Sequence, residues 1–385
     1  MAAFPFVTRP TELHLQHCLN ARHSSAGCDL CSTLCPAQAV TLSGNSVSLD
    51  LDRCVGCGLC LHICPAEVFE APYWSERTPV ANIAELNDVV DLFCAHHPRP
   101  ETGRPDVGSL QIPTCLAAMS PGSWFEMGLD RAVCARLDAC ADCPLAGVSG
   151  EIRSATDVAN DWLRDSGHDA CITCLVMSAD AGAEVQRPVL SGEHRRVSRR
   201  GFFKMLFASE RSRAGRAQNV FDIPWTGQES PKKTPRLPAW MAHAASVFAS
   251  RAQAAPEAPV TAWPSITVGA DCVTCDACTD YCPTGALEVC VEADRYTIAF
   301  RPGQCVDCRI CWASCPVGTI TRSQASTASP FERQPIMQRP IASCAQCGRP
   351  AAEGTICYWC GEEPPLAVVM TDARRWLLSS SIACR

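Results

Sequence analysis

Apolar and polar residues alternate in two pairs of short segments, one pair near each end of the chain. The first pair, within residues 39–50, flanks the turn dipeptide Gly44-Asn45, and the second pair lies within residues 287–300. Alternation with a period of two around a short turn is typical of β-hairpins. The sequence therefore predicts one hairpin in each of these two regions.

Between these hairpins, short continuous apolar segments alternate with amphipathic ones. The apolar segments lie at 89–93, 110–114, 132–137 and 171–177, and the amphipathic segments lie at 123–130 and 151–167. Short apolar strands that alternate with helices indicate a parallel sheet covered by helices. We predict an α/β domain over residues 84–186.

Residues 187–265 are rich in Arg, Pro and Ala and contain one predicted helix, at 239–255, set among prolines. This composition is typical of a linker or of a segment that packs along a partner. The apolar stripe of the helix has no obvious partner within the chain, which favours a second subunit. The basic stretch 198–204 resembles a twin-arginine export motif, but it lies mid-chain and precedes charged residues, so we interpret it as a turn of amphipathic helix.

Cysteine is the unusual part of the composition, with 29 in 385 residues, an odd number that excludes complete intramolecular disulfide pairing. The net charge of −7 argues against binding to nucleic acid or to an anionic membrane. The sequence has no secretory signal and no apolar stretch of about 18 residues that could span a bilayer. We therefore expect a cytoplasmic protein without a membrane span.

Most of the cysteines fall in four copies of one pattern. In the strict form, three cysteines are separated by two residues each, and a fourth follows after three more and precedes proline, as in 54–65, 272–283 and 305–316. The looser copy at 18–36 has nine residues between its first two cysteines. Such a run supplies three thiolates to one [4Fe–4S] cluster and its fourth thiolate to the neighbouring cluster.

This rule predicts four [4Fe–4S] clusters in two pairs. Site 1 comprises Cys18, Cys28, Cys31 and Cys64; site 2 comprises Cys35, Cys54, Cys57 and Cys60; site 3 comprises Cys282, Cys305, Cys308 and Cys311; and site 4 comprises Cys272, Cys275, Cys278 and Cys315. Structural zinc is the alternative, although zinc sites use paired CxxC knuckles without a proline-terminated run. The long gap after Cys18 leaves open a site 1 cluster with an open or substituted iron corner.

Both pairs of runs resemble bacterial-type two-cluster ferredoxins, and the whole chain in this respect resembles a polyferredoxin. The resemblance implies dicluster ferredoxin modules at residues 10–78 and 266–325, each a small α+β unit that uses bound metal for part of its folding free energy.

A further iron–sulfur site is predicted in the α/β domain. Cys94, Cys115 and Cys140 follow three successive predicted strands, and Cys143 completes a CxxC. Ligands gather beyond the carboxyl ends of parallel strands, so these four cysteines form a candidate middle site. The pattern resembles the small iron–sulfur subunit of methyl-viologen-reducing hydrogenases, which implies a [2Fe–2S] cluster, although that family's denser cysteine cluster is missing. Buried thiols without a ligand are the alternative.

Several other cysteines and histidines are predicted to lie outside the sites: His96, His97, Cys134, Cys171, Cys174, Cys290 and Cys384. Cys134 lies within a predicted strand, and Cys171 and Cys174 fall on opposite faces of another. Cys290 falls on the polar face of its hairpin. We interpret His96 and His97 as surface loop residues, with two-His cluster ligation as the alternative.

Two CxxC-Gly knuckles follow the second ferredoxin module, within residues 340–364. Their cysteines are Cys344, Cys347, Cys357 and Cys360. Four thiolates in tetrahedral arrangement suit zinc, and the motif resembles a zinc ribbon or a rubredoxin knuckle. We predict structural zinc at this C-terminal site, with rubredoxin-like iron as the alternative.

The predicted fold class is α+β multidomain: two dicluster ferredoxin-like modules that flank an α/β domain, with a C-terminal zinc ribbon. The sequence has no nucleotide-binding, Ser-His-Asp or HExxH motif, and no catalytic residue is predicted. We expect a non-catalytic electron-transfer subunit that relays single electrons to or from a catalytic partner in a hetero-oligomeric oxidoreductase complex, with a redox carrier as a second candidate partner. The alternatives are an iron–sulfur and zinc scaffold or assembly protein with structural or redox-sensing clusters, and a catalytic cluster at site 1 or the middle site.

Overall fold

The computed structural model describes the chain in segments. These are residues 12–23, 26–72, 74–169, 171–176, 185–193, 235–251, 263–292, 294–322, 330–352, 354 and 356–361. The basic stretch 198–204, most of the segment 187–265 and Cys384 lie outside the described residues. Within the described residues, no helix combines the length and the apolar character needed to cross a membrane.

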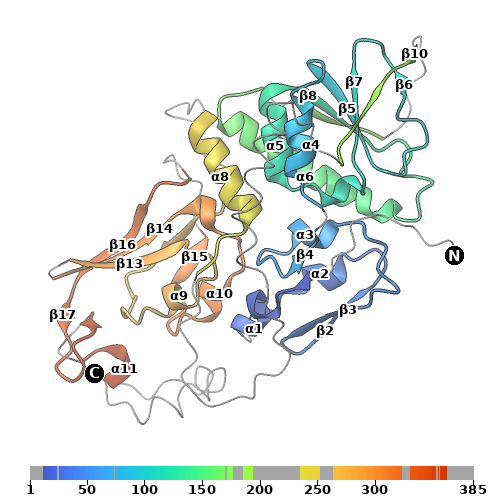
Figure 1. The fold of residues 1–385 in the computed structure, drawn as a ribbon. Helices are drawn as coiled ribbons and strands as arrows, with labels where there is room; N and C mark the ends of the chain where they lie inside the picture. Colours follow the sequence, from blue (N-terminus) through green and yellow to red (C-terminus); the bar gives the residue numbers. More distant parts are fainter. Residues whose placement is uncertain are drawn as a thin grey trace, which may run out of the picture.

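The first ferredoxin-like module is built from very short elements (Figure 1). Its helices are α1 (Leu19–Arg22), α2 (Leu30–Thr33) and α3 (Leu59–Ile63), and its strands are β1 (Glu12–Leu13), β2 (Val40–Ser43), β3 (Ser46–Leu49) and β4 (Phe69–Glu70). Strands β2 and β3 form the expected hairpin, and β1 pairs antiparallel with β4. A small buried cluster, which includes Val40, Val47, Val68 and Phe69 together with Cys18 and Cys64, forms its core.

The α/β domain contains a parallel five-stranded sheet in the order β11-β7-β5-β8-β9. The strands are β5 (Val89–Phe93), β7 (Gly108–Gln111), β8 (Ala132–Arg136), β9 (Ile172–Leu175) and β11 (Val189–Ser191), and the helices are α4 (Arg77–Ile83), α5 (Pro121–Asp130) and α6 (Ser149–Asp165). A two-stranded ribbon of β6 (Thr102–Gly103) and β10 (Val185–Gln186) lies beside the sheet. Strand β11 was not expected from the sequence, and it extends the domain beyond residue 186.

Helix α8 (Ala239–Arg251) has an apolar partner inside the chain. Its residues Ala244, Val247 and Phe248 belong to the core of the α/β domain, where the Phe248 ring stacks 6.0 Å from the Phe125 ring of α5. In Figure 1, this yellow helix lies between the α/β domain and the second module. The expectation that its apolar stripe has no partner within the chain is therefore wrong, because the partner surface lies more than 100 residues away in sequence.

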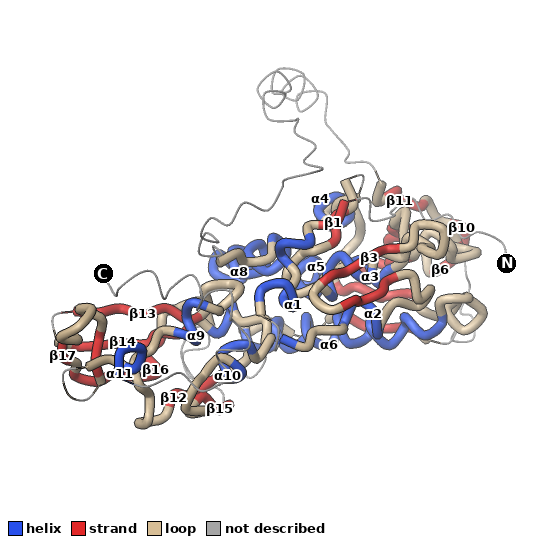
Figure 2. The backbone as a smooth tube through the Cα atoms, turned by 90° about the horizontal axis from the view of Figure 1, so that it is seen from below, coloured by secondary structure: helices blue, strands red, loops and turns tan. Residues whose placement is uncertain are grey.

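The second ferredoxin-like module repeats the plan of the first with an added strand. Its elements are β12 (Ile266–Val268), α9 (Ala277–Asp280), β13 (Leu287–Glu292), β14 (Arg295–Phe300), α10 (Ile310–Ala313), β15 (Ile320–Arg322) and β16 (Gln334–Pro340). β13 and β14 form the expected hairpin, and the unexpected strand β16 pairs with β14 to make a three-stranded sheet. The chain then forms a small C-terminal unit of β17 (Ala342–Ser343), β18 (Pro350–Ala351) and α11 (Tyr358–Gly361). Figure 2 shows this unit and the α/β domain at opposite ends of the molecule.

Candidate iron–sulfur and zinc sites

The cysteine runs share a backbone conformation that is rare elsewhere in the described segments. In the three strict runs, the residues on either side of the second cysteine have positive φ angles: Gly56 and Gly58, Thr274 and Asp276, and Asp307 and Arg309. The third residue after the fourth cysteine also has a positive φ in all four runs: Gln38, Glu67, Gly285 and Gly318. Every non-glycine residue with positive φ in the described segments belongs to these two groups. Because this region costs L-residues roughly 1–2 kcal/mol, its repetition indicates loops that are shaped for ligation.

Two cavities coincide with two of the predicted cluster sites. One is lined by all four cysteines of site 2, by Cys31 of site 1 and by apolar side chains that include Val40, Leu49 and Ile63. The other is lined by all four cysteines of site 4 and by apolar side chains that include Val268, Ile298 and Ile320. In each cavity the fourth cysteine, Cys35 or Cys315, comes from the neighbouring run, as the crossover rule requires.

At sites 1 and 3, one thiol of each site, Cys31 or Cys305, has the other three cysteines of its predicted site as electrostatic neighbours. Burial, together with the neighbouring thiolates of Cys64, Cys28 and Cys18, raises the pKa of the Cys31 thiol to about 12. Burial, together with the neighbouring thiolates of Cys282, Cys308 and Cys311, likewise raises the pKa of Cys305 to about 12. Cys18 is therefore a neighbour of the rest of site 1 despite the long gap that follows it in the sequence.

The thiols that line these two cavities suit the ligation of a charged iron–sulfur cluster. Burial is the main cause of the raised pKa values of Cys57, Cys60, Cys275 and Cys278, so these thiols without metal are protonated at neutral pH. Backbone hydrogen bonds oppose this effect, for example at Leu59 for Cys57 and at Ala277 for Cys275. The amide N–H of Ala39 also donates to the Cys35 sulfur over 3.3 Å. Iron binding must therefore displace the thiol protons, and amides directed at the sulfurs would stabilise the thiolates that result.

The four cysteines of the middle site lie beyond the carboxyl ends of the parallel strands. Cys94 directly follows β5, and Cys115 and Cys140 come four residues after β7 and β8 respectively. Burial raises the pKa of Cys115, and the neighbouring thiolates of Cys94, Cys57 and Cys140 raise it further. Cys143 is in turn a neighbour of both Cys94 and Cys140. The structure thus brings these four cysteines to one edge of the sheet and also brings Cys57 of site 2 next to them.

The remaining cysteines of the α/β domain point to other partners. Cys171 donates from its sulfur to the Gly128 carbonyl oxygen over 2.9 Å, whereas the Cys174 sulfur lies 3.4 Å from the Thr156 hydroxyl. Neither of these contacts involves a cysteine of the middle site. Cys134 lies in β8 beside Asp91, Arg136 and Thr173.

His97 is a buried residue, which differs from the surface position expected for it. Its imidazole packs edge-on against Phe93, with ring centres 4.6 Å apart, and Nε2 lies 3.5 Å from Asp138 Oδ2. Asp138 also pairs with Arg136. The sequence indicated a loop but not that this loop folds back over the end of β5. His97 is thus part of a buried polar network beside the middle site.

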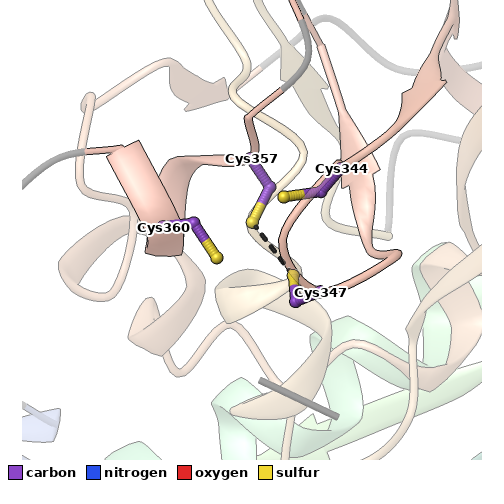
Figure 3. Close-up of side chains that lie close together, drawn as sticks. All are labelled: Cys344, Cys347, Cys357 and Cys360. Carbon is purple, nitrogen blue, oxygen red and sulfur yellow. Dashed lines mark hydrogen bonds between the residues drawn. The ribbon is translucent and has the colours of Figure 1, made fainter. Parts of the chain in front are cut away.

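The C-terminal site differs from the other sites in its sulfur separation. The four sulfurs of Cys344, Cys347, Cys357 and Cys360 all lie within 4.8 Å of one another, and they converge on one point in Figure 3. The Cys347 and Cys357 sulfurs are 3.5 Å apart, close to the roughly 3.8 Å expected for thiolates around one tetrahedral zinc. Backbone hydrogen bonding, foremost at Cys357, lowers the pKa of Cys344 to about 6. This donor set therefore fits a single thiophilic ion.

Two polar residues near site 4 were not identified from the sequence. Tyr296, which is fully buried, lines the site 4 cavity and donates from its hydroxyl to Asp276 Oδ1 over 2.6 Å. Arg339 donates to the Cys272 carbonyl oxygen. The alternation in 295–300 places Tyr296 on the core face of the hairpin, which was the available signal. Arg339 gave no comparable signal, because it lies on the unexpected strand β16.

The C-terminal unit docks directly on site 4. The Trp359 indole N–H donates to the Cys275 carbonyl oxygen over 2.9 Å, and the Thr274 hydroxyl donates to the Pro350 carbonyl oxygen over 3.3 Å. Both contacts involve the run that begins at Cys272, so the knuckles and this run fold against each other.

Two segments of the chain match known protein families. Residues 26–73 match the LdpA Fe-S cluster-binding domain, and residues 271–319 match the 4Fe-4S dicluster domain. The first match begins after Cys18, whereas the second includes every cysteine of sites 3 and 4. No curated protein matches the chain. The two matches, together with the geometry of the cysteine runs, establish that the chain contains ferredoxin-like iron–sulfur modules of the kind that bind [4Fe–4S] clusters.

Proposed function

We propose that the chain is an electron-transfer iron–sulfur subunit that holds four [4Fe–4S] clusters at sites 1 to 4. The observation that carries this proposal is the crossover at the two cavities, where Cys35 and Cys315 join the three cysteines of the neighbouring run. This arrangement favours paired clusters over isolated metal ions, because a cysteine shared between runs holds the two clusters of a module side by side.

The protein's contribution to the chemistry is to bind the clusters and to set their potentials. A bound [4Fe–4S] cluster accepts and donates one electron at a time. Apolar side chains such as Val40, Leu49 and Ile63 limit the access of water at site 2. Amide hydrogen bonds to cysteine sulfur, as at Ala39, would stabilise the reduced state.

Two further metal centres belong to this proposal. The middle site would hold one more iron–sulfur cluster, an assignment supported by the convergence of its four cysteines and by the closeness of Cys57 to Cys115. The C-terminal site would hold structural zinc, an assignment supported by the sulfur separations. Zinc has no redox chemistry, so this centre would end the series of redox sites and stabilise the fold around site 4.

We further propose a catalytic oxidoreductase subunit as the partner, in the reducing cytoplasm. The two cavities described here both coincide with predicted cluster sites. A net charge of −7 favours docking to a basic surface of the partner. Helix α8 gives no support to this partner, because its apolar residues are buried within the chain, and the partner proposal rests on charge alone.

A scaffold or assembly protein with structural or redox-sensing clusters is the second candidate function. The docking of the C-terminal unit on site 4 through Trp359 favours a structural role for at least that metal centre. An EPR-monitored redox titration of anaerobically purified protein separates the two functions. Electron transfer predicts that most clusters are reduced rapidly and reversibly. Clusters that stay redox-inert while their removal disrupts partner binding would instead support the scaffold.

A further inference from the structure

The two ferredoxin-like modules meet at a junction formed by residues that neighbour site 1 and site 3. On the first module's side, Arg22 lies one helical turn after Cys18, and its guanidinium reaches the second module. Its Nε donates to the Tyr281 carbonyl oxygen over 3.3 Å, and its Nη2 donates to the Cys282 carbonyl oxygen over 3.1 Å. Cys282 is the cysteine that the run at 272–283 contributes to site 3 by crossover. Figure 1 shows α1 next to α9 and α10.

A second arginine links the same two sites from the other direction. The backbone N–H of Arg236 donates to the Pro283 carbonyl oxygen over 2.8 Å, and its side chain lies 3.0 Å from Glu67 Oε2. Glu67 lies in the turn after Cys64, and Pro283 lies in the corresponding turn after Cys282. The proline turns of sites 1 and 3 are thus connected through one residue.

Aromatic and van der Waals contacts complete the junction. The buried His23 ring packs edge-on against Tyr281, with ring centres 4.7 Å apart. A Cβ atom placed on Gly285 would lie 3.1 Å from Pro235, so the segment that carries Arg236 packs closely against the second module. These contacts pack the two modules against each other.

We propose that this junction is the point of electron exchange between the modules, and that Arg22 is a positioning residue that holds site 1 against site 3 and stabilises the reduced state of site 3. This inference rests on the proposed electron-transfer function. The exchange involves one electron, which one cluster loses and the other gains, without making or breaking a bond. A fixed positive charge beside the Cys282 carbonyl oxygen favours the extra negative charge on the reduced side.

The junction also sets the order of the centres along the molecule. Cys57 of site 2 neighbours the middle site, sites 1 and 2 share the first module, and site 3 shares the second module with site 4. Site 4 in turn contacts the C-terminal unit through Trp359. The redox centres therefore form a single series from the α/β domain to site 4, in which the junction around Arg22 and Arg236 links the two modules.

The test compares anaerobically purified full-length R22Q, R22K and the control R104Q, whose arginine is exposed and paired with Asp106 in the α/β domain. In R22Q we expect one cubane EPR signal to titrate at a more negative potential while the other signals keep theirs. Rapid freeze-quench EPR after reduction by less than one electron per chain should show several-fold slower redistribution between signals. R22K should restore most of the potential, and R104Q should match the unmodified protein.

Different results would contradict the proposed electron-transfer function and the proposed junction. Iron and sulfide contents too low for four clusters in the unmodified protein would contradict the proposed function. Full contents together with unchanged potentials and redistribution in R22Q would overturn the junction alone. If R22Q does not accumulate, R236Q decides the matter, because it removes the side-chain contacts of Arg236 with Glu67 and His17 and keeps its backbone hydrogen bond to Pro283. Slower redistribution in R236Q supports the junction, and the rate of the unmodified protein overturns it.

Discussion

His62 Nε2 lies 2.8 Å from the carbonyl oxygen of Ala117 and joins the last turn of α3 to the short helical turn that follows Cys115. Burial lowers the pKa of His62 to about 4, so the ring is neutral near pH 7 and Nε2–H donates to this carbonyl. The Thr114 hydroxyl adds a hydrogen bond to the Gly56 carbonyl oxygen over 3.2 Å. The first ferredoxin-like module and the α/β domain therefore share a buried polar interface between site 2 and the middle site.

The substitution G58A should destabilise this interface. Gly58 has a φ of +79°, and a Cβ atom on it would overlap the Cβ of Ala118. Left-handed backbone and overpacking together should lower the free energy of unfolding by about 2–4 kcal/mol. Anaerobic denaturant unfolding of the cluster-loaded protein measures this change.

Gly147 provides the matched control for G58A. It is exposed, has no positive φ, and no heavy atom lies within 4 Å of the position that its Cβ would occupy. G147A should therefore change the free energy of unfolding by less than about 1 kcal/mol. Equal stability of G58A and G147A would contradict the close contact between Gly58 and Ala118.

We expect the substitution of two cysteines of the α/β domain to have different effects on the iron content. C115S should remove the iron of one cluster, about two irons if the cluster is [2Fe–2S]. C134S should keep that iron, because Cys134 lies beside Asp91 and Arg136 and is not one of the four cysteines of the middle site. Iron analysis and EPR of both variants measure the effect. If both variants lose this iron, or if neither does, the four cysteines of the middle site do not form a cluster site.

The C-terminal site predicts a selective loss of zinc. C347S removes one of the four sulfurs that lie within 4.8 Å of one another, so it should lower the zinc content from about one per chain to near zero. The iron content should stay unchanged. C290S is the control, since the Cys290 sulfur interacts with Glu292 and belongs to none of the sites. Retention of zinc in C347S would argue against this site.

The backbone of the cysteine runs could be predicted from the sequence only in part. Gly56 and Gly58 indicate left-handed residues in the first strict run, because glycine adopts positive φ at little cost. Thr274 and Arg309 occupy equivalent positions with the same sign of φ and give no such signal. The cysteine spacing, rather than local propensity, was therefore the reliable indicator of these loops.

The hairpins and four of the five parallel strands could be predicted because their apolar pattern is local. The packing of α8 and the junction between the modules could not. Arg22 and Cys282 are separated by 260 residues, and neither residue type indicates the other as its partner. Strand β16 begins after Arg333 and ends on Pro340, and its prolines obscured the strand pattern.

A buried carboxyl group gives the α/β domain a specific pH dependence. Burial raises the pKa of Glu76, while the Ser120 backbone N–H and hydroxyl donate to its two carboxylate oxygens over 2.8 Å and 3.0 Å. Because its pKa is higher in the folded state than in the unfolded state, the folded state binds more protons between the two values. The contribution of Glu76 to stability is therefore fully present below its ordinary pKa of about 4.5 and is lost as the pH rises through the raised value.

The substitution E76Q isolates this effect. Glutamine keeps an oxygen acceptor for the Ser120 N–H but does not titrate, so the variant should lose part of the decrease in stability above pH 4.5. Thermal unfolding of both proteins across mildly acidic to neutral pH measures the difference. Parallel stability profiles would show that Glu76 does not titrate with a raised pKa.

The central claim is that two pairs of crossed cysteine runs hold four cubane clusters in one chain. Measurement of iron and acid-labile sulfide in anaerobically purified protein tests this claim most directly. We predict about 16 irons and a similar amount of sulfide from sites 1 to 4, with any iron of the middle site in addition. A total near eight irons would mean that only one module carries its pair of clusters, and protein without labile sulfide would contradict the claim altogether.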